Sequence, residues 1–309
     1  MHLSSFIVSP AALDTALNNA DKQSARLVPL SAAWFLPNDP QHRTGSQSFR
    51  DRRIPGSRFF DLDEIKDASS PWPHMLPSDQ MFADAMGKLG IRRDDTVVVY
   101  DTAELGIFSA PRVAWTLKVF GHPKTHLLNN FRIWVDEDRP TESGEPLQSE
   151  PVTYKVPETT PTSQWVADFE EMQSIVQAKR DGKHDAASPV LIDARPKGRW
   201  EGTAPEPRPG MPSGHMPGSM SLAFSDVLDP QTKALLPPEK IRELLKTKQV
   251  PADADMISSC GTGVTAAVVD TALAEAGWSS SSSRRIYDGS WTEWASRLRP
   301  EDGWIQIHK

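Results

Sequence analysis

Residues 256–266 read Met-Ile-Ser-Ser-Cys-Gly-Thr-Gly-Val-Thr-Ala, and this stretch decides the class of fold. Its first four residues, 256–259, predict a short buried strand. Residues 266–276 predict a helix rich in alanine and valine that stops at Gly277. The residues between them form a loop at the carboxyl end of a strand, which is where α/β sheets present their ligand sites.

The loop holds Cys260, the single cysteine in a chain of 309 residues. Gly261 and Gly263 allow backbone conformations in which successive N–H groups point inward and form an anion-binding nest. The start of the following helix adds the positive end of its dipole, so both features favour a thiolate over a thiol. A lone cysteine is more often structural, but this setting indicates a functional nucleophile.

Composition and the loop itself exclude several classes of protein. A cysteine-based phosphatase needs an arginine six residues after its cysteine, where this chain has Ala266, and the loop lacks the lysine of a nucleotide P-loop. One cysteine excludes internal disulfides, a redox Cys-x-x-Cys pair and a cysteine-rich zinc site. The net charge of −7 argues against direct binding of nucleic acid or anionic lipid. No apolar run approaches the ~20 residues that span a membrane.

Metal and cofactor binding are not expected. His122 and His126 are four residues apart, but Gly121 and Pro123 argue against a helix that would place both histidines on one face. We therefore predict no metal site and no bound cofactor.

Short apolar strands alternate with amphipathic helical stretches along the chain. In the second half we predict helices at 172–179 and 238–247, a strand at 189–192, and another strand that ends at Tyr287. In the first half, a strand at 96–100 ends at Asp101, and a helix begins with a Ser109 cap and an early Pro111. This alternation predicts the α/β class, with a mostly parallel sheet and helices on both faces.

The two halves of the sequence repeat the same landmarks at nearly one offset. Residues 54–57 (Ile-Pro-Gly-Ser) match residues 216–219 (Met-Pro-Gly-Ser), and their prolines are 217 − 55 = 162 residues apart. The other matched landmarks, at offsets of 159 and 160, are Asp101 with Cys260 and 130–134 with 290–294. We interpret this as the duplication of one domain of about 150 residues.

A proline-rich stretch separates the halves. Prolines recur through residues 141–163 with Thr, Ser and Glu between them, which keeps the backbone extended and excludes long helices. We predict an N-terminal domain over 1–140, a linker over 141–163 and a C-terminal domain over 164–309.

The loop 260–265, the stretch 287–294 (Tyr-Asp-Gly-Ser-Trp-Thr-Glu-Trp) and the tandem organisation together resemble the rhodanese superfamily, over nearly the whole chain. The resemblance implies two tandem rhodanese-like domains and a sulfurtransferase that carries sulfur as a persulfide on Cys260. Glycine and threonine directly after the cysteine resemble the 3-mercaptopyruvate branch, because the thiosulfate branch carries basic residues there. The first domain would be catalytically silent in its own loop, because Asp101 cannot carry a transferable sulfur.

Residues 193–208 are similar to the substrate loop of that family. By position in the motif, Arg199 and Arg208 would bind the carboxylate and carbonyl oxygens of a 2-oxo acid, for which a guanidinium supplies two donors in fixed geometry. We expect Arg195 and Asp193 to be structural and to pair near the end of a strand.

The resemblance also implies a hydroxyl–histidine–aspartate relay. Asp63 and His74 match the family's carboxylate and imidazole, and Thr262 would supply the hydroxyl where many relatives carry serine. With Cys260 they make the expected catalytic set, to which the first half of the chain contributes two members. The remaining expected substrate-binding residues are Gly261, Gly263, Val264 and Thr265.

The implied reaction moves sulfur from 3-mercaptopyruvate through a Cys260 persulfide to a thiol, such as a thioredoxin-type dithiol, or to cyanide, and it releases pyruvate. Two alternatives stay open: a thiosulfate sulfurtransferase, and a relay protein that passes persulfide sulfur on for tRNA thiolation. The chain has no second thiol. Unless two chains pair through Cys260, each turnover must therefore end on an external acceptor.

The start of the chain bears on location. It lacks a basic segment followed by an apolar core, and its first arginine, Arg26, comes after acidic Asp14 and Asp21. We therefore expect neither a secretory signal nor an arginine-rich mitochondrial presequence. We predict a cytoplasmic protein without membrane association, with the mitochondrion as the alternative location.

Overall fold

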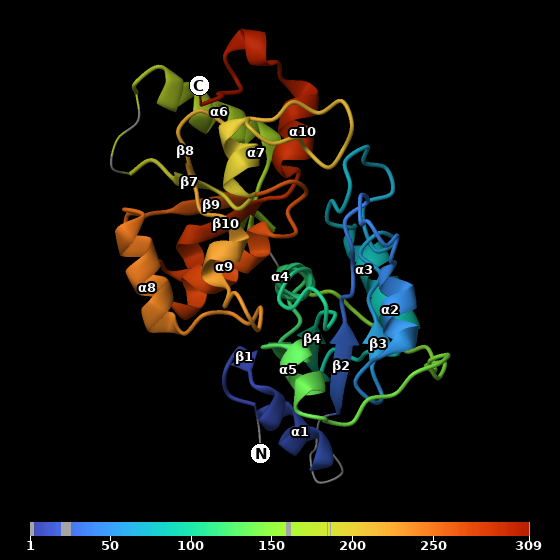
Figure 1. Cartoon of the computed structure of the whole chain (residues 1–309). Helices are drawn as coiled ribbons and strands as arrows, with labels where there is room; N and C mark the ends of the chain where they lie inside the picture. Colours follow the sequence, from blue (N-terminus) through green and yellow to red (C-terminus); the bar gives the residue numbers. More distant parts are fainter. Residues whose placement is uncertain (1–2, 20–25, 159–161, 184, 186, 309) are drawn as a thin grey trace. The chain divides into compact units, whose positions relative to one another are not determined.

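The computed structural model describes residues 3–19, 26–158, 162–183, 185 and 187–308 (Figure 1). The chain divides into two compact units. The first comprises Met1–Ser69, Leu76–Thr160 and Pro230–Ala234, and the second comprises Ser70–Met75, Pro161–Asp229 and Leu235–Lys309. Each unit is therefore built mainly from one half of the sequence and includes one short segment from the other half.

The described part of the first unit contains a five-stranded sheet in which all paired strands are parallel. Its order is β1-β5-β4-β2-β3, with strands β1 (Ile7–Val8), β2 (Leu27–Ser31), β3 (Arg58–Phe59), β4 (Thr96–Tyr100) and β5 (Thr125–Leu128). Its helices are α1 (Pro10–Asn18), α2 (Gly45–Asp51), α3 (Asp79–Lys88), α4 (Ala110–Val119) and α5 (Phe131–Asp136). Helices α1 and α5 share a core cluster with the sheet, and α4 contacts β4 and β5.

The second unit repeats this arrangement. Its order is β6-β10-β9-β7-β8, again all parallel, with strands β6 (Val166–Ala167), β7 (Val190–Asp193), β8 (Ser219–Ser221), β9 (Met256–Ser259) and β10 (Arg284–Tyr287). Its helices are α6 (Phe169–Arg180), α7 (Lys197–Glu201), α8 (Pro238–Thr247), α9 (Ala266–Glu275) and α10 (Ser290–Arg297). Short 3₁₀ turns occur at Thr162–Gln164, Phe224–Val227, Ser281–Ser283 and Pro300–Asp302.

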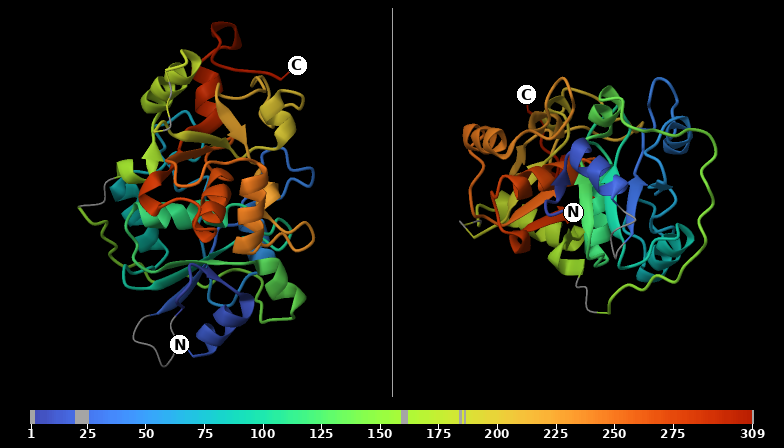
Figure 2. Two further views of the ribbon diagram at one scale, coloured as in Figure 1. Left: turned by 90° about the vertical axis from the view of Figure 1, so that its left-hand side faces the viewer. Right: turned by 90° about the horizontal axis from the view of Figure 1, so that it is seen from below.

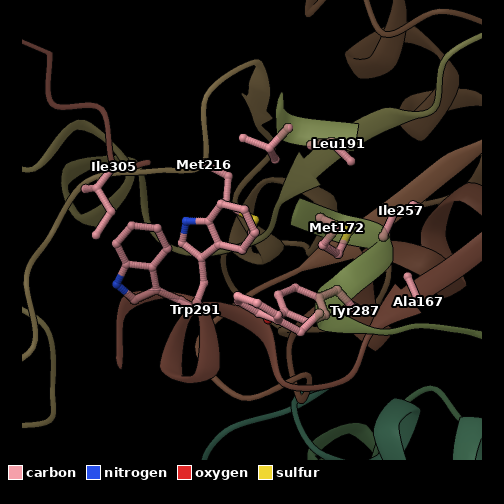
Figure 3. Packing of buried hydrophobic residues seen from close by; sticks show 11 residues of the cluster. Ala167, Met172, Leu191, Met216, Ile257, Tyr287, Trp291 and Ile305 are labelled. Atoms are coloured by element: carbon pink, nitrogen blue, oxygen red, sulfur yellow. The ribbon is translucent and has the colours of Figure 1, made fainter. Parts of the chain in front are cut away.

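The core of the second unit lies between its sheet and the helices α6 and α10, while α8 and α9 cover the other face (Figures 1 and 2). Met172 of α6 and Trp291 of α10 pack with Leu191 and Ile257 of the central strands, and all four are at most 1% exposed (Figure 3). This burial fixes α10 against the sheet, and with it the turn that enters α10 beside the end of β9.

The predicted fold class is confirmed: the chain is α/β, and each unit has a parallel sheet flanked by helices. The common strand order is what duplication of one domain predicts. Three predicted elements, the strands β4 and β9 and the helix α8, have the expected bounds. Helix α6 begins at Phe169, three residues before the predicted start, because the Asp168 carboxylate accepts a hydrogen bond from the Glu171 N–H and caps it there.

The stretch that we expected to be a linker makes contacts within the first unit. Glu142 pairs its backbone with Arg53, at 3.0 and 2.9 Å, and also accepts a hydrogen bond from the Arg53 side chain at 2.8 Å. Tyr154 is only 5% exposed. Residues 141–158 therefore run along this unit, and residues 159–161 of the stretch lie outside the described part of the chain.

Candidate functional site

Cys260 follows β9 directly, at the carboxyl edge of the second sheet, and is 2% exposed. Gly261 is partly covered, and residues 262–266 are buried. Gly263 has φ of 74°, in the left-handed region that glycine adopts without steric cost. That conformation lets the six residues 260–265 carry the chain from the strand into α9.

The backbone N–H groups of residues 261–266 point to an anion site. Among the described residues, none of these six successive donors has a hydrogen-bond acceptor. Buried N–H groups in native proteins are nearly always paired, with protein, water or ligand. The donors also lie at the N-terminus of α9, where the helix dipole favours negative charge. The loop around Cys260 can therefore hold an anion.

The turn that enters α10 holds the opposite side of this loop. The Cys260 N–H donates to the Ser290 hydroxyl oxygen at 3.2 Å, and the Trp291 N–H donates to the Cys260 carbonyl at 2.9 Å. The Gly261 carbonyl accepts from the Thr292 N–H at 2.9 Å and from the Thr292 hydroxyl at 2.7 Å. These four hydrogen bonds fix the backbone of the nucleophile and its neighbour, so the loop donors that follow have a fixed position.

Ser290 adopts a strained backbone to make its contact. Its φ is 50°, in the left-handed region that serine rarely occupies, and its side chain is fully buried. The hydroxyl donates to the Tyr287 carbonyl at 2.8 Å, which leaves its oxygen free to accept from Cys260. Strain of this kind persists where the surrounding structure over-determines it, and such places cluster at functional sites.

His74 and Thr262 lie together, although 188 residues separate them in sequence. The His74 Nδ1 atom is 2.9 Å from the Thr262 hydroxyl oxygen, and the two residues are 2% and 4% exposed. His74 belongs to the segment Ser70–Met75, which is part of the second unit, and its φ of 62° is again in the left-handed region. The structure thus joins two residues of the predicted relay.

Asp63, the third residue of the predicted relay, belongs to the first unit. It is exposed, and its carboxylate accepts a hydrogen bond from the Trp34 indole N–H at 3.0 Å. Its part in a relay with His74 stays a prediction.

The two predicted substrate arginines lie on the loop that follows β7. Arg199 stands in α7 with its side chain 16% exposed, and its Nη1 is 3.4 Å from a carboxylate oxygen of Glu206. The described residues offer its Nε and Nη2 groups no acceptor, so part of the guanidinium fork can bind an added ligand. Arg208 is partly exposed, and its carbonyl accepts from the Met211 N–H at 3.4 Å.

Arg195 is structural, as predicted, and forms the centre of a buried ion-pair network. Its guanidinium bonds both carboxylate oxygens of Asp193, at 2.6 Å for the shortest contact, and one oxygen of Glu206 at 2.8 Å. It also donates to the Gly214 carbonyl at 2.6 Å and lies 4.1 Å above the Trp291 ring. The side chains of Asp193 and Arg195 are 0% exposed and that of Glu206 is 3% exposed.

Sequence reasoning missed three residues of this region: Glu206, Ser290 and Thr292. Glu206 stands in Pro-Glu-Pro-Arg between the two predicted arginines, and this rigid setting was the available signal. Ser290 and Thr292 lie in the stretch 287–294 that carried the family resemblance. Nothing in their own sequence neighbourhood indicates that they contact the cysteine loop.

The loop of the first unit at Asp101 is filled by its own side chain. The buried Asp101 carboxylate accepts hydrogen bonds from the backbone N–H groups of Phe108, Ser109 and Ala110, at 2.8, 2.9 and 2.9 Å. As predicted, Ser109 is the N-cap residue of α4 and Pro111 lies in its first turn, but the Ser109 hydroxyl makes no capping hydrogen bond, because it bonds Asp101 and the Ala32 carbonyl instead. A carboxylate is the stronger acceptor at a helix N-terminus, so it replaces the hydroxyl there.

The described residues include neither a candidate metal site nor a candidate membrane-spanning helix. Among them no group of three or more His, Cys, Asp or Glu is placed to hold a metal ion. The His122 ring contacts the Tyr154 hydroxyl and the Asp95 carbonyl, and burial lowers the pKa of His122 to about 4. Within the same residues, no helix has both the length and the apolar composition that a membrane crossing requires.

Comparison with known proteins gives the class of this molecule. The family model of the rhodanese-like domain matches residues 173–297. The chain is 40% identical to the thiosulfate sulfurtransferase Tum1 of Saccharomyces cerevisiae, with 97% of each chain covered. It is 38% identical to the probable 3-mercaptopyruvate sulfurtransferase of Schizosaccharomyces pombe, with 92% of each covered. It also matches the sulfur transferase subunit found sub-stoichiometrically with yeast mitochondrial complex I, with TM-score 0.86, 36% identity and 99% and 100% of the two chains covered.

These likenesses extend over almost the entire chain, so they define its class: the protein is a sulfurtransferase. It belongs to the rhodanese family, as the loop 260–265 and the stretch 287–294 predicted.

The buried carboxyl of Asp101 makes the stability of the first unit depend on pH. Burial raises the pKa of Asp101 to about 6, against the hydrogen bonds that lower it, whereas the ordinary value is 3.8. Between those values the folded state binds more protons than the unfolded state, so stability is greatest below about pH 4 and falls as pH rises through 6. The expected loss is about 3 kcal/mol.

Urea unfolding of the wild type and of Asp101→Asn between pH 4 and 7 measures this dependence. Asparagine stays neutral, so the pH dependence of the difference between the two proteins isolates Asp101. Parallel stability curves across that range would contradict the assignment.

Proposed function

We propose that the protein transfers sulfur from 3-mercaptopyruvate to an external acceptor through a persulfide on Cys260, and releases pyruvate. The observation that carries this proposal is the row of six backbone N–H groups at residues 261–266, which have no acceptor among the described residues. A persulfide anion on Cys260 would accept several of these hydrogen bonds. Preorganised donors of this kind stabilise developing charge at no cost of reorganisation.

In the first half of the reaction the Cys260 thiolate attacks the thiol sulfur of 3-mercaptopyruvate. A sulfur–sulfur bond forms, the carbon–sulfur bond breaks, and its electron pair stays on carbon as the enolate of pyruvate. The proton of the substrate thiol ends on that carbon, so the products are pyruvate and a persulfide anion. The N–H groups of Gly261, Gly263, Val264 and Thr265 would surround the outer sulfur.

We assign the movement of this proton to Thr262 and His74. Their hydrogen bond, 2.9 Å long and buried, gives a hydroxyl and an imidazole in direct contact beside Cys260. With Nδ1 unprotonated, the ring accepts the hydroxyl proton, so Thr262 can take a proton in turn from the substrate. Asp63 is proposed, on the family resemblance, as the carboxylate that stabilises the charged ring.

We assign the carboxylate and carbonyl oxygens of the substrate to Arg199 and Arg208. The unpaired Nε and Nη2 donors of Arg199 support this, because an arginine with two free donors binds a carboxylate in bidentate geometry. The residues directly after the cysteine, Gly261 and Thr262, are uncharged and leave the negative charge of the substrate to these arginines.

In the second half of the reaction an acceptor attacks the outer sulfur of the persulfide. The sulfur–sulfur bond breaks and the Cys260 thiolate is regenerated. Cyanide would become thiocyanate and a small thiol would become a persulfide. A dithiol of the thioredoxin type would close to its disulfide and release sulfide. We propose such a thiol as the acceptor, because the chain offers no thiol besides Cys260.

A thiosulfate sulfurtransferase is the second candidate, and the name of the 40% identical relative favours it. Thiosulfate would load Cys260 with the same persulfide and release sulfite. The ratio of kcat/KM for 3-mercaptopyruvate and for thiosulfate decides between the two donors. A relay protein for tRNA thiolation would instead turn over neither free donor and would be loaded by a protein donor.

The location of the protein follows the same division. We propose the cytoplasm, as expected from the sequence, with the mitochondrion as the alternative that the complex I subunit of yeast favours. Fractionation of cells that express the tagged chain separates the two.

Loading of Cys260 is the first test. Incubation with 3-mercaptopyruvate should add about 32 Da, one sulfur atom, to the peptide that contains Cys260, as measured by mass spectrometry. Cys260→Ser should show no added mass and no pyruvate release. Sulfur transfer by the serine variant would overturn the persulfide mechanism.

The hydroxyl of Thr262 gives a second test. Thr262→Val keeps the shape of the side chain but removes the hydroxyl, so kcat for pyruvate release should fall about 100-fold. Thr262→Ser keeps the hydroxyl and should remain within a few-fold of the wild type. Equal kcat values for the valine and serine variants would remove Thr262 from the proton path.

A further inference from the structure

We propose that Glu206 is a positioning residue for substrate binding: it holds the guanidinium of Arg199 in place by tying it to the buried Arg195. The inference rests on the proposed function, in which Arg199 binds the carboxylate of the donor. Neither the sequence motif nor the family resemblance assigns a role to Glu206.

The Glu206 carboxylate contacts two arginines, one with each oxygen. One oxygen is 2.8 Å from Nη1 of Arg195, and the other is 3.4 Å from Nη1 of Arg199. The side chain of Glu206 is 3% exposed, so both contacts are shielded from solvent. One buried carboxylate therefore fixes the distance between the two guanidinium groups.

Arg195 is held in place by several contacts. Its side chain is 0% exposed, and it bonds both oxygens of Asp193 and the Gly214 carbonyl. Its guanidinium also stacks on Trp291, whose backbone N–H bonds the carbonyl of Cys260. Arg195 is thus fixed relative to the nucleophile loop. Glu206, through its two contacts, fixes Arg199 relative to Arg195.

The backbone at Glu206 is restricted, because Glu206 lies between Pro205 and Pro207. Pro207 restricts Glu206 to extended conformations, and the ring of Pro205 fixes its own φ. The backbone at Glu206 therefore loses little conformational freedom when the carboxylate bonds the two arginines. Long exposed side chains lose far more, which is why an isolated arginine on a loop is a poor clamp.

Two donors of the Arg199 guanidinium remain available to a ligand. Glu206 takes one nitrogen of Arg199, and among the described residues the Nε and Nη2 donors have no acceptor. The pair presents a partly neutralised, oriented fork to the substrate, with two donors in one plane. Without Glu206 the Arg199 side chain, on a helix of only five residues, would sample several rotamers. Substrate binding would then bear the cost of ordering it.

Steady-state kinetics on the full chain tests the proposal with 3-mercaptopyruvate as the donor. Glu206→Gln keeps the size of the side chain but removes the charge, and it should raise KM about tenfold while kcat stays within twofold. Glu206→Asp keeps the charge and should recover most of the wild-type KM. The matched control is Glu201→Gln, which removes the same charge from a partly exposed side chain of α7 and should leave KM unchanged.

A double-mutant cycle shows whether Glu206 acts through Arg199. In an Arg199→Ala background, Glu206→Gln should change KM by less than twofold, because the side chain that it positions is gone. A tenfold rise in both backgrounds, or a fall in kcat that follows the loss of thermal stability, would overturn the proposal. If Glu206→Gln does not fold, Glu206→Ala in the two backgrounds takes its place: a KM equal to the wild-type value, or a rise of the same size without Arg199, overturns the proposal equally.

The choice of sulfur donor distinguishes a failure of this proposal from a failure of the proposed function. If the wild type turns over thiosulfate and not 3-mercaptopyruvate, the proposed donor is wrong. The same variants measured with thiosulfate then decide whether Glu206 positions Arg199, since thiosulfate also carries its charge on oxygens that a guanidinium can bind.

Discussion

The second unit is built around one constraint. Six successive backbone N–H groups beside Cys260 have no acceptor among the described residues, so water or a ligand has to accept their hydrogen bonds. An unpaired buried donor costs about 1–3 kcal/mol, so such a row is stable only where an anion or water completes it. Strand β9, helix α9 and the turn at Ser290 each contribute to keeping these donors in place. The carbonyls of Cys260 and Gly261 turn away from the site toward Trp291 and Thr292. These backbone contacts fix the directions of the loop donors independently of any side chain of the loop.

The two units meet the same requirement in different ways. In the first unit the Asp101 carboxylate accepts three backbone N–H groups at the start of α4, so that loop is closed and its anion is part of the chain. In the second unit the side chain at the corresponding position is Cys260, and the donors stay open. One fold therefore gives a loop that is closed by its own carboxyl group and a loop whose donors remain open to an added anion.

Sequence patterns predicted the fold better than the site. Buried apolar runs set β4 and β9, and the amphipathic pattern set α8, because each depends on its own residues. The Arg195–Asp193 pair could be predicted because the two residues are neighbours at a strand end. Ser290, Thr292 and Glu206 could not, since their partners come from other segments and no local pattern reports those contacts. His74 came only from family resemblance, and nothing in its proline-rich surroundings indicates that Thr262 lies 2.9 Å away.

The different lengths of the two loops have a consequence for the history and the stoichiometry of the molecule. Helix α4 begins 110 − 101 = 9 residues after Asp101, whereas α9 begins 266 − 260 = 6 residues after Cys260. A single codon change from aspartate to cysteine would restore a thiol in the first unit but not the short loop that surrounds Cys260. The two units thus differ in the length of this loop as well as in its first residue. Under the proposed mechanism, with Cys260 as the single thiol, each chain would carry one persulfide at a time.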